Sequence, residues 1–84
     1  MNPDSARVVV YSRNGCHLCE TAEAIVAEVC AELGVEWARV DIDPVPELKE
    51  RFTFEVPVTF VDGEQHDMWQ VDATRLREAL LEAR

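Results

Sequence analysis

Basic side chains are scarce in this chain. Its 84 residues hold 8 lysines and arginines against 17 aspartates and glutamates, which gives a formal net charge of -9 at pH 7. A surface with this excess of negative charge repels polyanions and anionic lipid surfaces at long range. The composition therefore argues against nucleic acid and against a membrane as partners.

Long hydrophobic runs are missing as well. The first seven residues lack the basic start and apolar stretch of a secretory signal, and no later run approaches the roughly 20 apolar residues that span a bilayer. We therefore expect a soluble, cytoplasmic protein. A chain of 84 residues has room for one domain, residues 1–84, and for no second functional module.

Cysteine occurs only three times, and an odd number fits a disulfide-stapled scaffold poorly. Two of the three, Cys16 and Cys19, form a Cys-x-x-Cys pair. A structural zinc site needs about four ligands, but only Cys30, His17 and His66 remain, and their spacing does not complete such a site. We therefore interpret the pair as redox-active and expect no bound metal.

The pair lies where a strand pattern meets a helix pattern. The β-branched run within residues 7–12 is typical of a buried strand. From Cys16 to about Leu33 apolar residues recur at helical spacing, and Gly34 can end this helix in a left-handed conformation. A helix start offers unpaired N–H groups and the positive end of the dipole, which favour a thiolate at Cys16. Cys19 follows one turn deeper on the same face, so we predict Cys16 as the catalytic nucleophile and Cys19 as the resolving thiol.

Other chemically distinctive side chains have more than one interpretation. A protonated His17 can favour the neighbouring thiolate, or it is only an exposed residue at the helix start. Cys30 falls on the apolar stripe of the helix, so we predict a buried, inert thiol. Trp37 and Trp69 can line a peptide groove, but packing is the commoner role of a strand tryptophan. His66 lies among polar residues, and we expect it to be solvated.

The middle of the chain continues with alternating patterns. Residues 35–42 form a strand-like run, which makes the first elements a βαβ unit with parallel strands. Asp43-Pro44 signals the start of a short helix with Leu48 and Phe52 on one face. Residues 56–61 are another β-branched run.

The last third predicts a hairpin and a helix. Asp62-Gly63 is a tight-turn signal that leads into a polar edge strand over residues 64–69. Asp72 can cap a final helix, whose apolar face carries Leu76, Ala79, Leu80 and Ala83. The order βαβαββα predicts an α/β fold with a four-stranded mixed sheet flanked by helices.

A family pattern runs through these elements. It consists of Tyr11-Ser12-Arg13-Asn14-Gly15-Cys16-His17-Leu18-Cys19, of Val56-Pro57 before a strand, and of a glycine-containing hairpin followed by a terminal helix. With these motifs essentially the whole chain resembles glutaredoxin-like proteins of the thioredoxin-fold superfamily, in particular a branch with a Gly-Cys-His-Leu-Cys active site. The resemblance implies a thioredoxin-like fold of the glutaredoxin type and thiol–disulfide exchange chemistry.

The same resemblance implies three substrate-binding residues. Pro57 would be cis and pack beside the active-site disulfide, and Val56 would present its backbone N–H and C=O to an extended thiol substrate. Arg13 stands three residues before the nucleophile, where glutaredoxins carry a lysine that helps bind glutathione and stabilise the thiolate. The alternative for Arg13 is an exposed loop arginine with little effect on the thiol.

The motifs that bind glutathione in glutaredoxins are altered here. Leu18 replaces the aromatic residue between the cysteines, and Glu55 replaces the threonine before Val-Pro. Phe54 stands where a polar residue would meet a glutathione carboxylate. The Gly-Gly and following Asp are replaced by the segment Met68-Trp69-Gln70-Val71-Asp72. The catalytic half of the pattern is therefore intact, while binding of glutathione stays open.

We therefore expect a thiol–disulfide oxidoreductase that reduces protein or low-molecular-weight disulfides. It would need no cofactor, act as a monomer, and receive electrons from glutathione, another small thiol or a reductase. The alternative is a binding module with the same fold, which holds a partner or carries an iron-sulfur cluster between two protomers through Cys16.

Overall fold

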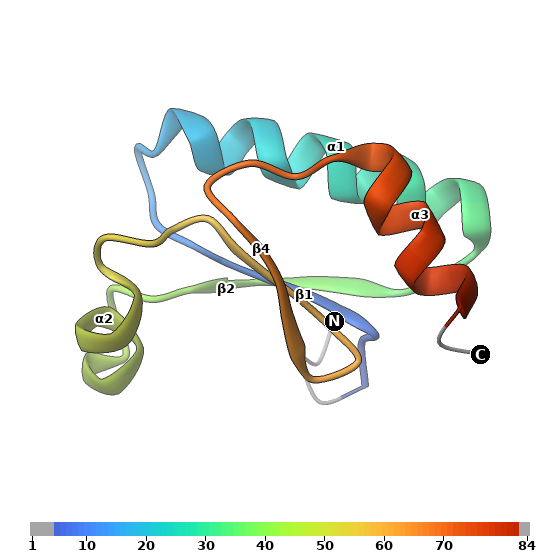
Figure 1. Ribbon diagram of the computed structural model, residues 1–84. Coiled ribbons are helices and arrows are strands. Elements are labelled where there is room, and N and C mark those ends of the chain that lie inside the picture. The colour runs from blue at the N-terminus through green and yellow to red at the C-terminus, as the bar shows by residue number, and fades with distance from the viewer. Residues whose placement is uncertain (1–4, 83–84) are drawn as a thin grey trace.

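A four-stranded mixed sheet runs through the molecule (Figure 1). The computed structural model describes residues 5–82. The strands are β1 (Val8–Ser12), β2 (Trp37–Asp41), β3 (Val58–Val61) and β4 (Glu64–Met68), in the spatial order β2-β1-β3-β4. Strands β1 and β2 are parallel, whereas β3 is antiparallel to both β1 and β4. The predicted α/β fold and its parallel and antiparallel halves are confirmed.

Three helices cover the two faces of the sheet. They are α1 (His17–Leu33), α2 (Pro46–Phe52) and α3 (Ala73–Glu82). Helices α1 and α3 lie together on one side, and α2 lies at the end of the other side (Figure 1). None of these helices, in the part of the chain that is described, has the length and apolar character needed to cross a membrane.

Each face of the sheet has its own core. The larger core, under α1 and α3, includes Val8, Val10, Val26, Val29, Leu76 and Leu80. The smaller core, under α2, includes Ile42, Phe52 and Val58, with the half-buried Tyr11 and Phe60 packed against them. Because strand side chains alternate between faces, the single strand β1 supplies Val8 and Val10 to the larger core and Tyr11 to the smaller one.

Proline decides where two elements begin. Helix α2 starts at Pro46, with Val45 as the N-cap, rather than at Asp43-Pro44 as predicted. A proline fits the first helical position because its φ angle is preset and its missing N–H has no helical partner there. Strand β3 starts at Val58, after Pro57, because proline cannot donate to the ladder.

The helix ends agree better with the sequence. Gly34 adopts a left-handed φ of 68°, and its N–H and that of Val35 donate to carbonyls of the last turn of α1. The carboxylate of Asp72 accepts the N–H of Arg75 at 3.1 Å, as predicted for a cap. Ala83, predicted on the apolar face of α3, lies outside the described residues.

Candidate redox site

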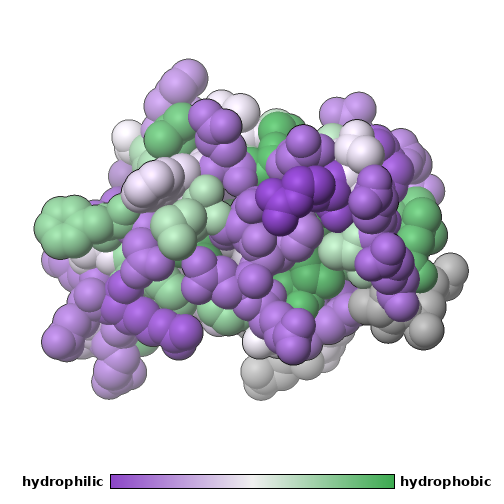
Figure 2. Space-filling model, viewed as in Figure 1, coloured by the Kyte–Doolittle hydropathy of each residue, from purple (hydrophilic) through white to green (hydrophobic). Residues whose placement is uncertain are grey.

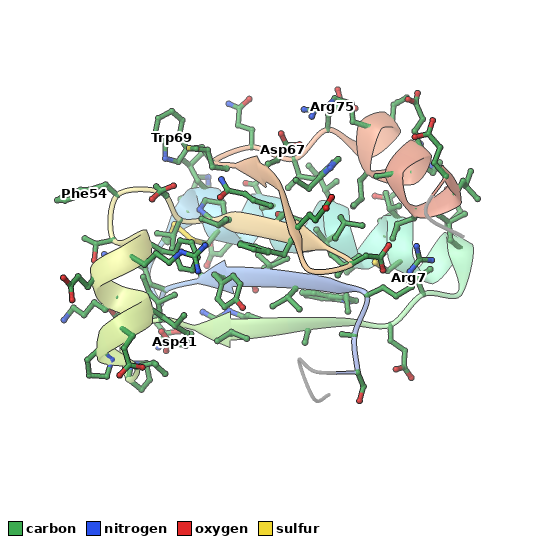
Figure 3. The ribbon with its side chains drawn as sticks, turned by 60° about the horizontal axis from the view of Figure 1, so that its bottom comes forward. Arg7, Asp41, Phe54, Asp67, Trp69 and Arg75 are labelled. Atoms are coloured by element: carbon green, nitrogen blue, oxygen red, sulfur yellow. A yellow bond between two sulfur atoms is a disulfide. The ribbon has the colours of Figure 1, made fainter. Side chains whose placement is uncertain are left out.

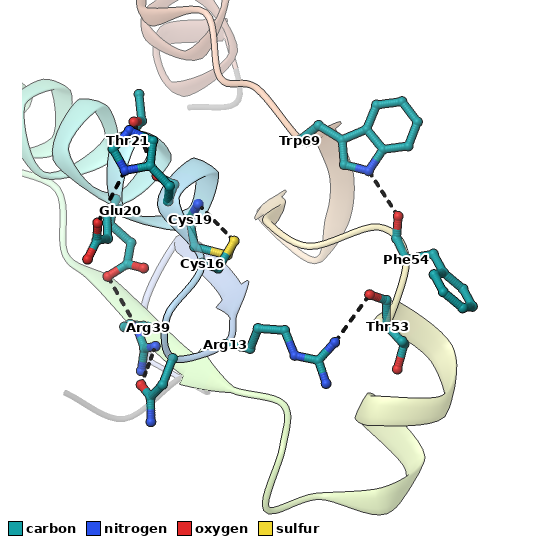
Figure 4. The surroundings of a disulfide bond; sticks show 12 residues. Arg13, Cys16, Cys19, Glu20, Thr21, Arg39, Thr53, Phe54 and Trp69 are labelled. Carbon is teal, nitrogen blue, oxygen red and sulfur yellow. Dashed lines mark hydrogen bonds and ion pairs between the residues drawn. A yellow bond between two sulfur atoms is a disulfide. The ribbon is translucent and has the colours of Figure 1, made fainter.

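The two cysteines form a disulfide at the junction of β1 and α1 (Figure 4). Gly15, with a left-handed φ of 76°, turns the chain from the strand toward the helix. Cys16 is the N-cap rather than the first helical residue, and its Sγ accepts the N–H of Cys19 at 3.1 Å. The sulfur of Cys16 therefore lies at the positive end of the 17-residue helix α1.

Solvent reaches the two sulfur-bearing residues unequally. Cys16 is half-buried, whereas Cys19 is only 1% exposed. An incoming disulfide can therefore approach Cys16 and not Cys19, which fits the predicted division into nucleophile and resolving thiol. The third cysteine, Cys30, is buried in the larger core, and burial raises the pKa of its thiol to about 11. A protonated, inaccessible thiol agrees with the inert role predicted for Cys30.

Pro57 and Val56 precede β3. The Val56-Pro57 peptide bond is cis, the configuration that the family resemblance implies, and Pro57 is fully buried. The carbonyl of Pro57 accepts the backbone N–H of Trp69 at 2.7 Å. The N–H of Val56 donates to the carbonyl of Phe52 at 3.1 Å. This corrects one detail of the prediction, because the N–H expected to meet a substrate already has a partner within the chain.

Arg13 makes contacts that the sequence did not predict. Its guanidinium donates to Asp43 Oδ1 at 2.6 Å and to the carbonyl of Thr53 at 3.4 Å (Figure 4 shows the second contact). The hydrogen bond from Arg13 lowers the pKa of the Asp43 carboxyl below its ordinary value. The charge of Arg13 is therefore already compensated, and an anionic substrate would have to compete with Asp43 for it.

His17 points into solvent. Its side chain is 92% exposed, and Nδ1 lies 3.7 Å from a carboxylate oxygen of Glu20. This placement favours the simpler of the two interpretations, an exposed residue at the helix start. Any influence of His17 on Cys16 remains a prediction. Within residues 5–82, no group of three or more cysteine, histidine or acidic side chains is arranged to hold a metal ion.

Of the two tryptophans, Trp69 differs from expectation and Trp37 does not. Trp69 was expected to pack, but it is 53% exposed and its indole N–H donates to the carbonyl of Phe54 at 3.0 Å. The Phe54 side chain is itself 88% exposed. Trp69 also has a left-handed φ of 66°, which ends β4 at Met68 instead of Trp69. Trp37, by contrast, is half-buried and packs against the larger core as predicted.

The environment of His66 is also different from the prediction. Its side chain is only 13% exposed, and Nε2 lies 3.6 Å from Asp67 Oδ2. Asp67 in turn accepts a hydrogen bond from Arg75 at 2.8 Å. A solvated His66 was therefore a wrong prediction, because β4 lies beside α3, where His66 lines a pocket together with Ala79 and Glu82. The polar residues of β4 gave no indication in the sequence that α3 packs beside this strand.

Known proteins are similar to this chain in sequence and in fold. The family model of the glutaredoxin-like domain (DUF836) matches residues 7–81. An uncharacterized protein of Mycobacterium tuberculosis is 34% identical over 76 residues, which cover 84% of this chain and 78% of the relative. A structural genomics target protein from X. campestris is 33% identical with a TM-score of 0.73, covering 92% of this chain and 97% of that chain.

Thioredoxins share the fold at greater distance. The thioredoxin of Fasciola hepatica is 26% identical with a TM-score of 0.60, covering 92% of this chain and 79% of that chain. The chain thus has a thioredoxin-like fold and belongs to the family of the glutaredoxin-like domain (DUF836).

Proposed function

We propose that this protein is a thiol–disulfide oxidoreductase that acts through Cys16 and Cys19. The observation that carries the proposal is the disulfide between a half-buried Cys16 and a buried Cys19 at a helix N-terminus. Such a position stabilises a thiolate at the accessible sulfur, and the thiolate is the form that attacks disulfides.

The reaction runs through a mixed disulfide. The Cys16 thiolate attacks one sulfur of the substrate disulfide, and the substrate S–S bond breaks as a bond from Cys16 to the substrate forms. The second substrate sulfur leaves as a thiolate and takes up a proton. The Cys19 thiol then loses its proton and attacks Cys16 Sγ, which releases the remaining substrate thiol. The substrate has gained two electrons and the pair is oxidised to its disulfide.

The surroundings of the pair serve both steps. The Cys19 N–H, 3.1 Å from Cys16 Sγ, favours negative charge on that sulfur, as does the helix dipole. The carbonyl of Val56 and the ring of Pro57 would border the substrate chain, and Arg13 would attract its anionic groups only at the expense of Asp43. A small thiol such as glutathione, or a reductase, would return the two electrons in the cytoplasm, and we expect the protein to act as a monomer.

The test is the redox equilibrium of the pair in glutathione buffers of defined ratio, with acid-trapped species identified by intact mass. The wild type should interconvert between dithiol and disulfide in a two-electron transition. Cys19→Ser should accumulate a mixed disulfide on Cys16, and Cys16→Ser should be inactive. Cys30→Ser is the matched control and should behave as the wild type. Full disulfide reductase activity of Cys16→Ser would overturn the proposal.

A further inference from the structure

Large apolar side chains are exposed around the disulfide. Among the described residues, five such side chains are exposed: Leu18, Phe54, Met68, Trp69 and Leu81. Leu18 and Trp69 line one groove, Met68 directly precedes Trp69, and the carbonyl of Phe54 accepts the indole hydrogen bond of Trp69, so we call these four residues the apolar rim. Leu18 lies between the two cysteines in the chain. The backbone N–H of Trp69 donates a hydrogen bond to the carbonyl of the cis proline, Pro57. Exposed apolar surface that gathers at one place marks an interaction site.

The figures place the two aromatic residues of the rim, Phe54 and Trp69, at one end of the molecule. Figure 2 shows hydrophobic side chains protruding at the end that carries α2 and the start of α1. Phe54 and Trp69 lie at this end, and Arg7 lies at the opposite one (Figure 3). In the close-up, Trp69 and Phe54 lie next to each other, joined by the indole hydrogen bond, across from Cys16 and Cys19 (Figure 4).

A groove of about 250 Å³ begins at Leu18 and Trp69 of the rim. It lies between α1 and the segment that follows β4, and is lined by Leu18, Ala22, Ile25, Trp69 and Val71 among others. Its lining is mostly apolar, and one of its walls begins at the residue between the cysteines. Leu18 and Trp69 thus belong both to the apolar rim and to this groove, so the groove extends the apolar surface of the rim.

The indole of Trp69 is held in place for contact. Its ring N–H donates to the carbonyl of Phe54 at 3.0 Å, and its backbone N–H donates to the carbonyl of Pro57 at 2.7 Å. The polar atom of the ring is thus satisfied inside the protein, and the rest of the ring remains as apolar surface. A ring fixed before binding loses little side-chain entropy when a partner covers it.

The charges beside the rim disfavour an anionic ligand. The half-buried Glu55 follows Phe54 directly, and the exposed Asp72 follows the groove residue Val71. Arg13, the cation that precedes the cysteine pair in the chain, is already paired with Asp43. Glutathione carries two carboxylates and no large apolar group. A peptide with apolar and basic side chains complements this surface in both respects.

We propose that the apolar rim docks an extended segment of a protein substrate, in which an apolar and a basic residue flank the cysteine under attack. Protein disulfides, and not glutathione disulfide, are then the preferred oxidised substrates. This inference rests on the proposed redox function and names its substrate class. Burial of an apolar substrate side chain against Trp69 and Phe54 favours the protein disulfide over glutathione disulfide, since covering one large side chain raises affinity about tenfold or more.

The experiment compares disulfides that share one leaving group. Cys19→Ser protein is mixed with conjugates of thionitrobenzoate, whose release by Cys16 attack is followed by visible absorption. The partners are a peptide with leucine and arginine beside its cysteine, the same peptide with serine for leucine, glutathione and mercaptoethanol. Each rate constant is divided by that of the mercaptoethanol conjugate. We expect the leucine peptide to react about tenfold faster than the serine peptide and than glutathione.

Substitutions in the apolar rim test whether its residues cause the preference for the leucine peptide. Trp69→Ala and Phe54→Ala should each lower the relative rate of the leucine peptide about tenfold, whereas Trp69→Phe should keep most of it because an apolar ring remains. The matched control is Leu81→Ala, which removes an equally exposed apolar side chain of α3 away from the disulfide and should change nothing.

The outcomes separate the two proposals. Unchanged relative rates in Trp69→Ala and Phe54→Ala, or a faster reaction with the glutathione conjugate, would overturn docking at the rim and leave the redox function standing. If Cys16 of the Cys19→Ser protein, with its rim unchanged, failed to react even with the mercaptoethanol conjugate, the redox function itself would be overturned.

Discussion

At the scale of single residues, three cysteines in one small domain have three different environments. The half-buried Cys16 caps a helix, Cys19 is buried in the first turn, and Cys30 is enclosed by the larger core. The chemical type of the side chain is the same in all three, so burial and position at the helix terminus are what distinguish the proposed nucleophile Cys16 from the buried Cys30.

Cys30 should therefore resist alkylation in the folded protein. Burial and a pKa of about 11 keep its thiol neutral and out of reach at pH 8. After reduction, a short pulse of iodoacetamide should modify Cys16 first and leave Cys30 unmodified until the chain is unfolded in urea. Peptide mapping by mass spectrometry measures this order. Labelling of Cys30 at the rate of Cys16 would contradict the buried placement.

Two hydroxyls in the core are unusual at the same scale. Ser12 and Thr59 are fully buried, and neither side-chain oxygen has a hydrogen-bond partner among residues 5–82. Their alternation places them on the sheet face of Val10, because Thr59 pairs directly with Val10 and Ser12 follows two residues later. Burying an unpaired hydroxyl costs about 1–3 kcal/mol.

Replacing Thr59 by valine should therefore stabilise the protein. The substitution keeps the β-branched shape and removes the unpaired hydroxyl, so we expect the free energy of unfolding to rise by about 1 kcal/mol. Urea denaturation of the reduced proteins measures the difference. Thr53→Val serves as the control, because the Thr53 hydroxyl already donates to the carbonyl of Lys49 and its loss should not stabilise. A destabilised Thr59→Val would mean that the hydroxyl is bonded in solution.

At the scale of elements, a single arginine joins three parts of the chain. Arg7, just before β1, donates two hydrogen bonds to Asp62 in the hairpin between β3 and β4 and a third to the carbonyl of Leu80 in α3. The hydrogen bonds from Arg7 lower the pKa of Asp62 below its ordinary value. The hairpin and the last helix are thereby fixed against the same strand.

The stability of this link should depend on pH in the acidic range. Because the pKa of Asp62 is lower in the folded state, its contribution is complete above the unfolded pKa near 3.9 and is lost as pH falls through the folded value. Asp62→Asn should be less stable than the wild type at pH 7 by at most about 1 kcal/mol, since the pair is partly exposed. Urea midpoints at pH 7 and at pH 3 should show this difference shrinking. If the stability difference between the wild type and Asp62→Asn were the same at both pH values, it would come from side-chain shape and not from the charge of Asp62.

At the scale of the whole molecule, the disulfide lies at one end, at the start of α1, while the net charge of the chain is strongly negative. The principal dimensions are 32 × 24 × 18 Å, and the net charge is -9. At 0.01 M salt the screening length of about 30 Å is as long as the molecule, and at 0.15 M it falls to about 8 Å. At low salt, the field at Cys16 thus includes nearly every charge of the protein.

Salt should consequently change the rate of Cys16 with charged disulfides. The doubly anionic dithiobis-nitrobenzoate should react several-fold faster at 0.15 M than at 0.01 M salt, because screening weakens its repulsion by the acidic protein. Neutral dipyridyl disulfide should show little change and is the control. Stopped-flow absorption measures both rates in the Cys19→Ser variant. An equal response of the two reagents would mean that the net charge has no influence at the site.

The sequence by itself determined the order of the elements and the place of the cysteine pair. The spacing of apolar residues, the glycine at the end of α1 and the aspartate before α3 are features of residues close together in the chain. They act on the local backbone conformation directly, because they set which face is buried and where a helix begins or ends. The pairing of Cys16 with Cys19 belongs to the same class, because both lie within one helical turn. These features could therefore be predicted without any knowledge of the packing.

The tertiary structure alone decided what surrounds the pair. Arg13 meets Asp43 across thirty residues, and the indole of Trp69 reaches the Phe54 carbonyl across fifteen. Sequence patterns report the burial and periodicity of one segment, whereas these contacts depend on how segments pack against each other. That is why the sequence predicted the nucleophile, and only the folded chain revealed the apolar rim and the compensated arginine beside it.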